Sequence, residues 1–170
     1  MRPVHLLLAD EGIGDVELEA LLGALAAAGL RVGLLALDRQ SELPVPPRLQ
    51  LAARSGALRG VQLHQSGSLV LKPRRGPAPL ADLVREHFLG CAAVLVVGTG
   101  GAPAELIGEL QPRGRVLRAV SLRRVAEDRW GLRPPRRPAD DRGGVEVSGT
   151  ELAARLRRPY LLADDADGGD

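Results

Sequence analysis

The chain alternates short apolar runs with segments in which apolar residues recur at helical spacing. Residues 4–9, 31–37, 92–97 and 116–120 are mainly apolar runs of five to seven residues, whose polar members are His5, Arg31 and Arg118. Runs of this length without polar alternation are typical of strands buried on both faces of a parallel sheet. The pattern therefore predicts at least four buried strands.

A helix is predicted between the first two strands. Its apolar residues fall at i, i+3, i+4 and i+7, which puts them on one stripe of an amphipathic helix: Leu18, Leu21, Leu22 and Leu25. We expect Asp15 to be the N-cap and Gly29 to end the helix. The first 37 residues then form a βαβ unit.

Weaker patterns cover the rest of the chain. Short strands are expected within 49–72 and a strand followed by a helix from 145 onward, and helices are expected near 79–88, 104–110 and 122–129. Strands that alternate with helices predict an α/β fold. We expect a three-layer, doubly wound, mostly parallel sheet with helices on both faces, which is a flavodoxin-like or glutamine amidotransferase-like arrangement. Residues 1–162 are expected to form a single domain, and the acidic tail 163–170 to be disordered.

Composition narrows the possible functions. The net charge is only +2, and aromatic residues make up 2% of the chain, which disfavours the stacking platforms of single-stranded nucleic-acid binders. Cys91 is the single cysteine, so no internal disulfide can form and a reducing compartment is expected. The apolar stretch at 4–9 is too short for a signal peptide or a membrane span, so we expect a cytoplasmic protein without membrane contact.

Candidate chemistry lies where the predicted parallel strands end. In doubly wound sheets, ligands bind beyond the carboxyl ends of the strands. The segments at those ends are Asp10–Glu17, Gly98–Gly101 and Ser121–Arg124. Ser121 follows an apolar strand and precedes a predicted helix, so it is either a nucleophile or a helix cap.

These segments together resemble the ThiJ/PfpI superfamily, which shares the fold of the class I glutamine amidotransferases. "LLLADEGIGDVELEALLGALAAAGLRV" is similar to the family's opening strand and helix, with Glu17 at its active-site glutamate. "VLVVGTGGAP" stands at the family's glycine-rich turn, and "GRVLRAVSLRR" aligns Ser121 with its nucleophilic cysteine. The resemblance covers roughly residues 1–132.

The chain departs from that family at the nucleophile. Ser121 replaces the cysteine, Leu122 the following small or imidazole residue, and Arg123 and Arg124 the usual Gly-Pro. A serine hydroxyl needs an adjacent base, and an ordinary carboxylate is a poor one. Backbone N–H groups near Gly100 and at Leu122 can bind an anion whatever the side chains are. We therefore expect an anion-binding site to persist even where the catalytic activity is lost.

Three functions follow as hypotheses. The first is a domain of this family that has lost cysteine catalysis and binds a small anionic metabolite or acts through a homodimer or partner. Its expected site has Ser121 and Glu17 at the former catalytic positions and an anion-binding group formed by Gly100, Gly101, Leu122, Arg123 and Arg124. The second is a serine hydrolase that uses Ser121 and Glu17.

The third hypothesis is an anion- or nucleic-acid-binding module, although nucleic acid is disfavoured by the composition. It would use a group of arginines: Arg118, Arg123, Arg124, Arg129, Arg136 and Arg137. We expect no cofactor and no metal, because His5, His64 and His87 lack ligand spacing.

Overall fold

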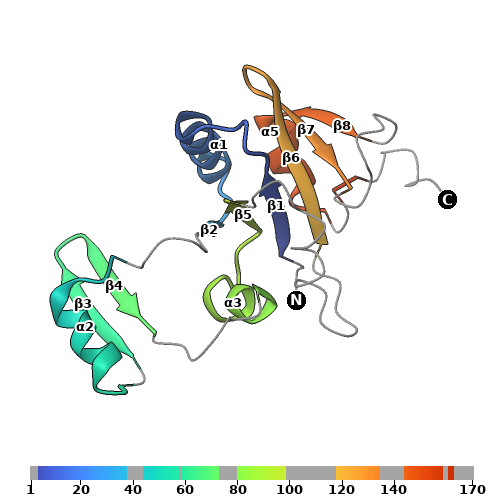
Figure 1. Cartoon of the computed structure of the whole chain (residues 1–170). Helices are drawn as coiled ribbons and strands as arrows, with labels where there is room; N and C mark the ends of the chain where they lie inside the picture. The colour runs from blue at the N-terminus through green and yellow to red at the C-terminus, as the bar shows by residue number, and fades with distance from the viewer. Residues whose placement is uncertain are drawn as a thin grey trace. The chain divides into compact units, whose positions relative to one another are not determined.

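A computed structural model describes residues 4–37, 44–57, 59–72, 80–98, 118–134, 144–158 and 161–162. The chain divides into two compact units where we expected one domain. Unit 1 comprises Met1–Leu37 and Pro79–Asp170, and unit 2 comprises Asp38–Ala78. The helix predicted at 104–110 and the tail at 163–170 lie outside the described residues. The two units are described separately below (Figure 1).

Unit 1 contains a six-stranded sheet in the order β2-β5-β1-β6-β7-β8. Its strands are β1 (His5–Ala9), β2 (Val32–Ala36), β5 (Ala93–Val97), β6 (Arg118–Ala126), β7 (Arg129–Arg133) and β8 (Val145–Ser148). The pairs β2–β5, β5–β1 and β1–β6 are parallel, whereas β6–β7 and β7–β8 are antiparallel. The predicted α/β class with a mostly parallel sheet is confirmed, and the sheet is mixed because its last two strands return as hairpins.

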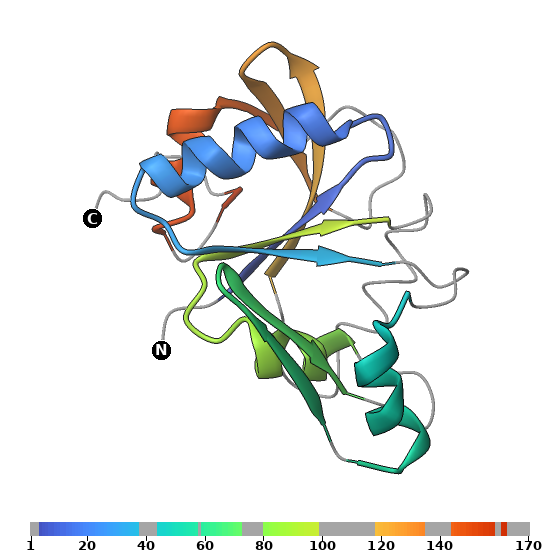
Figure 2. The ribbon, with the colours of Figure 1, turned by 90° about the vertical axis from the view of Figure 1, so that its left-hand side faces the viewer.

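The residues of β1 and β5 are apolar except for His5, because helices cover both faces of the sheet there. Leu7 and Ala9 of β1 belong to a core cluster with buried leucines of α1 (Asp15–Ala27) and α5 (Gly149–Arg155). Leu6 and Leu8, which point to the other face, belong to a second cluster that includes Val84 of α3 (Leu80–His87). Figure 2 shows α1 on one side of the sheet and α3 on the other. All five residues of β1 are buried, as strands covered on both faces require.

Helix α1 follows the predicted stripe, but it begins at Asp15 itself, so its N-cap lies one residue earlier than expected. Gly14 is the N-cap, with no side-chain hydrogen bond, so the prediction of Asp15 as the cap is wrong. Leu21 and Leu25 are the buried residues of the helix. Gly29 has a φ of +75°, which lets the chain turn immediately after the helix.

The segment predicted to begin a helix at 122–129 is instead a β-hairpin. Strand β6 continues through Leu122 to Ala126, and β7 returns antiparallel beside it. The residues between them, Glu127 and Asp128, form the turn, in which Asp128 has a φ of +53°. Val120 and Leu122 point into the core and alternate with Ser121 and Arg123, which is strand periodicity rather than helical periodicity.

His5 lies in the core beside the chain that follows α5. Its side chain is buried, and its Nε2 donates a hydrogen bond to the Arg158 carbonyl over 3.1 Å. Because a carbonyl oxygen only accepts, Nε2 carries a proton. His5 is therefore a structural residue that ties β1 to the end of α5.

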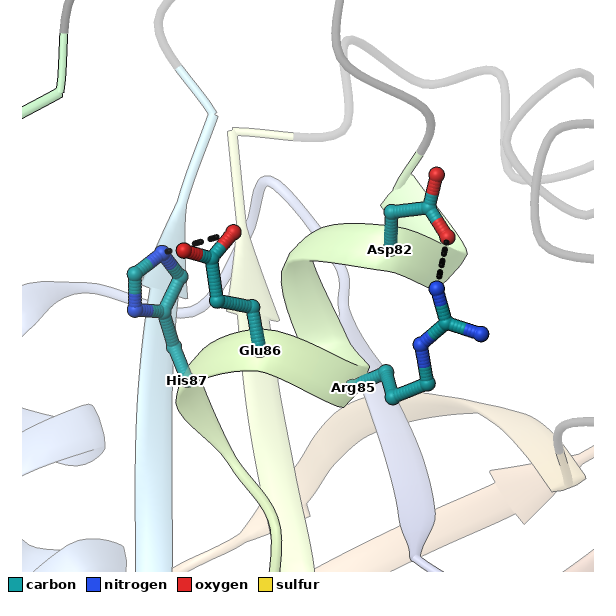
Figure 3. Close-up of polar contacts among 4 residues, drawn as sticks. All are labelled: Asp82, Arg85, Glu86 and His87. Carbon is teal, nitrogen blue, oxygen red and sulfur yellow. Dashed lines mark hydrogen bonds and ion pairs between the residues drawn. The ribbon is translucent and has the colours of Figure 1, made fainter. Parts of the chain in front are cut away.

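The outer surface of α3 carries charged side chains in local pairs (Figure 3). Arg85 Nη2 lies 3.0 Å from Asp82 Oδ1, one turn apart on the helix, and both side chains are more than half exposed. His87 Nε2 lies 4.0 Å from Glu86 Oε2. Exposed pairs of this kind contribute only a few tenths of a kcal/mol, so we assign this surface no site.

Unit 2 is a β-hairpin with one helix against it. The strands β3 (Gly60–His64) and β4 (Gly67–Leu71) pair antiparallel, as expected for this region, and α2 (Pro47–Arg54) packs on one face. A Cβ built on Gly60 would lie 3.0 Å from Leu49 Cδ2, so glycine allows this close approach. The sequence analysis missed α2, although Pro47 at its first turn is a common helix start.

None of the helices in the described part of the chain is both long and apolar enough to cross a membrane.

Candidate functional site

Two of the predicted site residues meet in the folded chain. Glu17, in the first turn of α1, accepts a hydrogen bond from Arg124 Nη1 near the end of β6. Arg124 lies beyond the last residue of β1 that pairs with β6, because Ala9 is opposite Leu122. The ion pair thus joins two residues, Glu17 and Arg124, that the sequence analysis placed in one site.

This ion pair borders an open cavity of about 350 Å³ between α1 and the β6–β7 hairpin, which we call the hairpin cavity. Its α1 wall is mostly apolar, and its opposite wall comes from the hairpin. The lining residues are Val16, Glu17, Ala20, Leu21, Ala24, Arg124, Glu127, Asp128 and Trp130. A cavity of this volume is at the small end of the range for ligand sites.

The charges around the hairpin cavity are unequal. Three carboxylates line it, and Arg124 is the only cation among the lining residues. The Glu17 and Arg124 side chains are 26% and 39% exposed, so their ion pair is only partly screened by water. Once Arg124 is neutralised by Glu17, the carboxylates of Glu127 and Asp128 leave the cavity with two negative charges.

Asp128 is fixed by the neighbouring helix rather than by the cavity. Its Oδ1 accepts a hydrogen bond from the Gly149 N–H at the start of α5, over 3.2 Å. Its left-handed backbone and this bond together hold the turn of the hairpin against α5. The carboxylate therefore has a defined position at the rim of the cavity.

Trp130 forms the buried floor of the hairpin cavity. Its side chain is only 4% exposed and belongs to the core cluster on the α1 face. It is opposite Arg124 in the β6–β7 register, so the two residues share that face of the hairpin. The cavity thus combines a rigid aromatic surface with charged groups at its rim.

Ser121 does not stand at a strand-to-helix corner. It lies within β6, paired with Leu8 on one side and Arg133 on the other. Val120 and Leu122 belong to the core on the α1 face, and Ala119 packs in the cluster on the α3 face. Side chains alternate along a strand, so Ser121 points to the α3 face, away from Glu17 on α1. The prediction that Ser121 occupies a nucleophile elbow is wrong.

Two further residues of the expected anion site, Leu122 and Arg124, lie on the α1 face of the sheet, opposite Ser121. Leu122 is fully buried and in register with Ala9 and Leu132, so its backbone faces two neighbouring strands rather than an open loop. A Cβ built on Gly131 would lie 2.9 Å from Arg123 Nε, so the Arg123 side chain crosses Gly131 on the face opposite Arg124. Gly100 and Gly101 lie outside the described residues.

The described residues contain no group of three or more His, Cys, Asp or Glu side chains arranged to hold a metal ion. The three histidines are on different elements: His5 on β1 and His87 on α3 in unit 1, and His64 on β3 in unit 2. Of the six arginines proposed for an anion-binding surface, Arg136 and Arg137 lie outside the described residues. Arg129 Nη2 is 3.9 Å from Glu146 Oε2 and Arg124 pairs with Glu17, so two of the others already have acidic partners.

The sequence analysis missed the hairpin side of the cavity. Glu127 and Asp128 fell within the helix predicted at 122–129 and Trp130 directly after it, so none of the three was considered as a site residue. The alternation of Trp130 and Leu132 with polar neighbours, following the Glu127–Asp128 turn, is the pattern that could have indicated a hairpin.

No protein-family model matches the sequence, and no curated protein matches it. Among solved structures, the chain is similar to a MobB protein homolog from Bacillus stearothermophilus, with 20% sequence identity and a TM-score of 0.40. The likeness covers 74% of this chain and 66% of that chain. A likeness this weak carries no functional argument.

The resemblance to the ThiJ/PfpI superfamily is overturned by these findings. No model of that family matches the sequence. The physical reason lies in β6, since the strand that should end at the nucleophile continues into an antiparallel hairpin. The roles transferred from that family to Ser121, Glu17 and the glycine-rich turn therefore lose their basis.

Proposed function

We propose that unit 1 is a ligand-binding domain that takes a small organic cation, such as a primary amine, in the hairpin cavity. One observation carries the proposal: the cavity pairs its single cation internally and keeps two further carboxylates over an apolar, aromatic floor. An alkyl ammonium group fits this arrangement, because its chain can cover Val16, Ala20 and Trp130 while its charge meets the rim.

The rim is suited to a cation for electrostatic reasons. Glu127 forms no ion pair within the described part of the chain and lies in an exposed turn, so it is available to an ammonium group. Asp128 keeps carboxylate lone pairs beyond the one that accepts from Gly149. Attraction at a partly apolar site is stronger than in bulk water.

An anionic metabolite, the ligand expected from the sequence, fits less well. It would have to displace Glu17 from Arg124 and approach Glu127 and Asp128, which repel it. A serine hydrolase finds no support in the arrangement of side chains, because Ser121 and Glu17 belong to opposite faces of the sheet.

The test uses n-hexylamine and hexanoate, which have the same chain length and opposite charges at neutral pH. Trp130 is the chain's only tryptophan, so its fluorescence reports directly on the floor of the cavity. We expect saturable quenching or shift with hexylamine and none with hexanoate. Glu127→Gln should weaken hexylamine binding about two- to fivefold, the range for a partly exposed charge pair.

Glu19→Gln is the matched control, because Glu19 is an exposed glutamate of α1 that does not line the cavity. It should leave hexylamine binding unchanged. The proposal fails if both probes bind alike, or if Glu127→Gln and Glu19→Gln have the same effect.

A further inference from the structure

Unit 2 exposes an apolar face on the side of its hairpin away from α2. Val61, Leu63 and Val70 are 59%, 80% and 58% exposed. Val61 is directly opposite Val70, and Leu63 is opposite Ser68. The neighbouring pair Gly60–Leu71 faces α2, with Leu71 buried, so alternation places Val61, Leu63 and Val70 together on the other face.

The hairpin also has strand edges without neighbours. Within the described residues, β3 and β4 form a sheet of two strands, so each has one side on which no further strand pairs. A two-stranded ribbon is marginally stable in water, and a third strand adds backbone hydrogen bonds and covers apolar side chains. Open edges of this kind are templates for strand addition.

Unit 2 is predominantly basic. Residues 38–78 contain seven basic and two acidic residues, a net charge of +5, and no Asp or Glu occurs from 43 to 81. The basic residues of the described part are Arg48, Arg54, Arg59 and Lys72. An acidic partner is therefore favoured, and a second copy of unit 2 is disfavoured because it would bring like charges together.

We propose that the β3–β4 hairpin of unit 2 binds an extended polypeptide segment of alternating apolar and acidic residues, which adds as a third strand. Alternation lets the apolar side chains cover Val61, Leu63 and Val70 while the acidic ones point to the opposite side of the extended sheet, where α2 carries Arg48 and Arg54. This site is separate from the hairpin cavity and does not depend on the proposed function.

Other anionic partners fit the surface less well. No Phe, Trp or Tyr occurs in residues 38–78, so unit 2 has no ring on which a nucleic-acid base could stack. The same absence leaves it without the aromatic side chains that anchor proteins at a lipid interface. A phosphate-rich partner would not place the three exposed aliphatic side chains in an apolar environment, so their contact with it would add no hydrophobic stabilisation.

The test uses the full chain and a fluorescent ten-residue peptide of alternating valine and glutamate. We expect its fluorescence anisotropy to rise on titration with the protein, with an affinity that falls as the NaCl concentration rises. The same peptide with two internal valines replaced by proline should not bind, because proline cannot continue a strand ladder. A valine–lysine peptide should not bind either.

Two variants distinguish peptide binding at this face from nonspecific apolar binding. Leu63→Ser should weaken the valine–glutamate peptide at least fivefold, and it should not impair folding because Leu63 is 80% exposed. Leu89→Ser makes the same substitution at an exposed leucine of unit 1 that does not line the hairpin cavity, 61% exposed, and should leave the affinity unchanged. Circular dichroism spectra of both variants should match that of the unchanged protein.

Hydrogen exchange gives a readout specific to strand addition. Bound peptide should slow amide exchange within 60–71, and the proline peptide should not. The proposal is overturned if the proline peptide binds equally well, if Leu63→Ser retains full affinity, or if anionic vesicles or single-stranded DNA bind in its place with the same dependence on Leu63.

Discussion

At the scale of single residues, the contact between Glu17 and Arg124 decides what the hairpin cavity can bind. The two residues are 107 positions apart in the sequence, and each was expected at a site from its place after a strand. The continuation of β6 beyond Ser121 could not be predicted from the sequence, because it depends on pairing with β7. The partnership of Glu17 with Arg124, rather than with Ser121, follows from that continuation.

Replacing Glu17 by glutamine should change the charge preference of the cavity. Glu17→Gln keeps the shape of the side chain but removes the charge that neutralises Arg124, so hexanoate should gain measurable binding and hexylamine should bind more weakly. The free energy of unfolding should fall by less than about 1 kcal/mol, because the ion pair is partly exposed. Tryptophan fluorescence titration and urea unfolding measure the two effects.

Glu19→Gln again serves as the control on the same helix, and it should alter neither binding nor stability. If hexanoate binds Glu17→Gln no better than it binds the unchanged protein, Glu17 does not neutralise Arg124 in solution.

At the scale of elements, the sequence predicted what local periodicity determines. The apolar runs became β1, β2 and β5, and the leucine stripe became α1, because burial on one or two faces leaves a direct trace in the order of residues. The β6–β7 hairpin was misassigned because Leu122-Arg123-Arg124-Val125-Ala126 has good helix formers, and only its partner strand makes it extended. Helix α2 was missed because the prolines at 44, 46 and 47, before and at its first residue, indicated a loop.

Helix α5 begins with a capping box, which gives this element a pH dependence. Ser148 Oγ accepts from the Glu151 N–H, and Glu151 Oε2 accepts from the Ser148 N–H. The hydrogen bond from the Ser148 backbone, followed by that from its side chain, holds the pKa of Glu151 below its ordinary value. A carboxyl whose pKa is lowered by folding stabilises the fold above its unfolded pKa and loses that contribution as the pH falls through its folded pKa.

We therefore expect the protein to be more stable than Glu151→Gln at pH 7 and to lose that advantage between about pH 5 and pH 3. Urea unfolding monitored by circular dichroism at several pH values measures the difference. The comparison with Glu146→Gln is the control, since Glu146 is an exposed residue of β8 outside the capping box. An advantage that stays constant down to pH 3 would contradict the assignment.

At the scale of the whole molecule, the chain has two compact units with different surfaces. Unit 1 carries a cavity whose excess charge is negative, and unit 2 carries an apolar face within a net charge of +5. The sequence shows this charge segregation directly, as an acid-free stretch from 43 to 81. Its division into a separate unit could not be predicted, because the prolines around 41–47 and 73–79 fit loops within one domain equally well.

The place of β1 in the sheet has a consequence for biosynthesis. β1 lies between β5 and β6, yet its last residue precedes β5 by more than 80 positions and β6 by more than 100. At about 5–20 residues per second, its leucines emerge from the ribosome several seconds before either neighbour can cover them. We expect ribosome-bound chains that stop before residue 118 to remain sensitive to protease and chains that include β8 and α5 to become resistant. β1, whose five residues are all buried in the folded chain, would then be the strand that stays uncovered longest during synthesis.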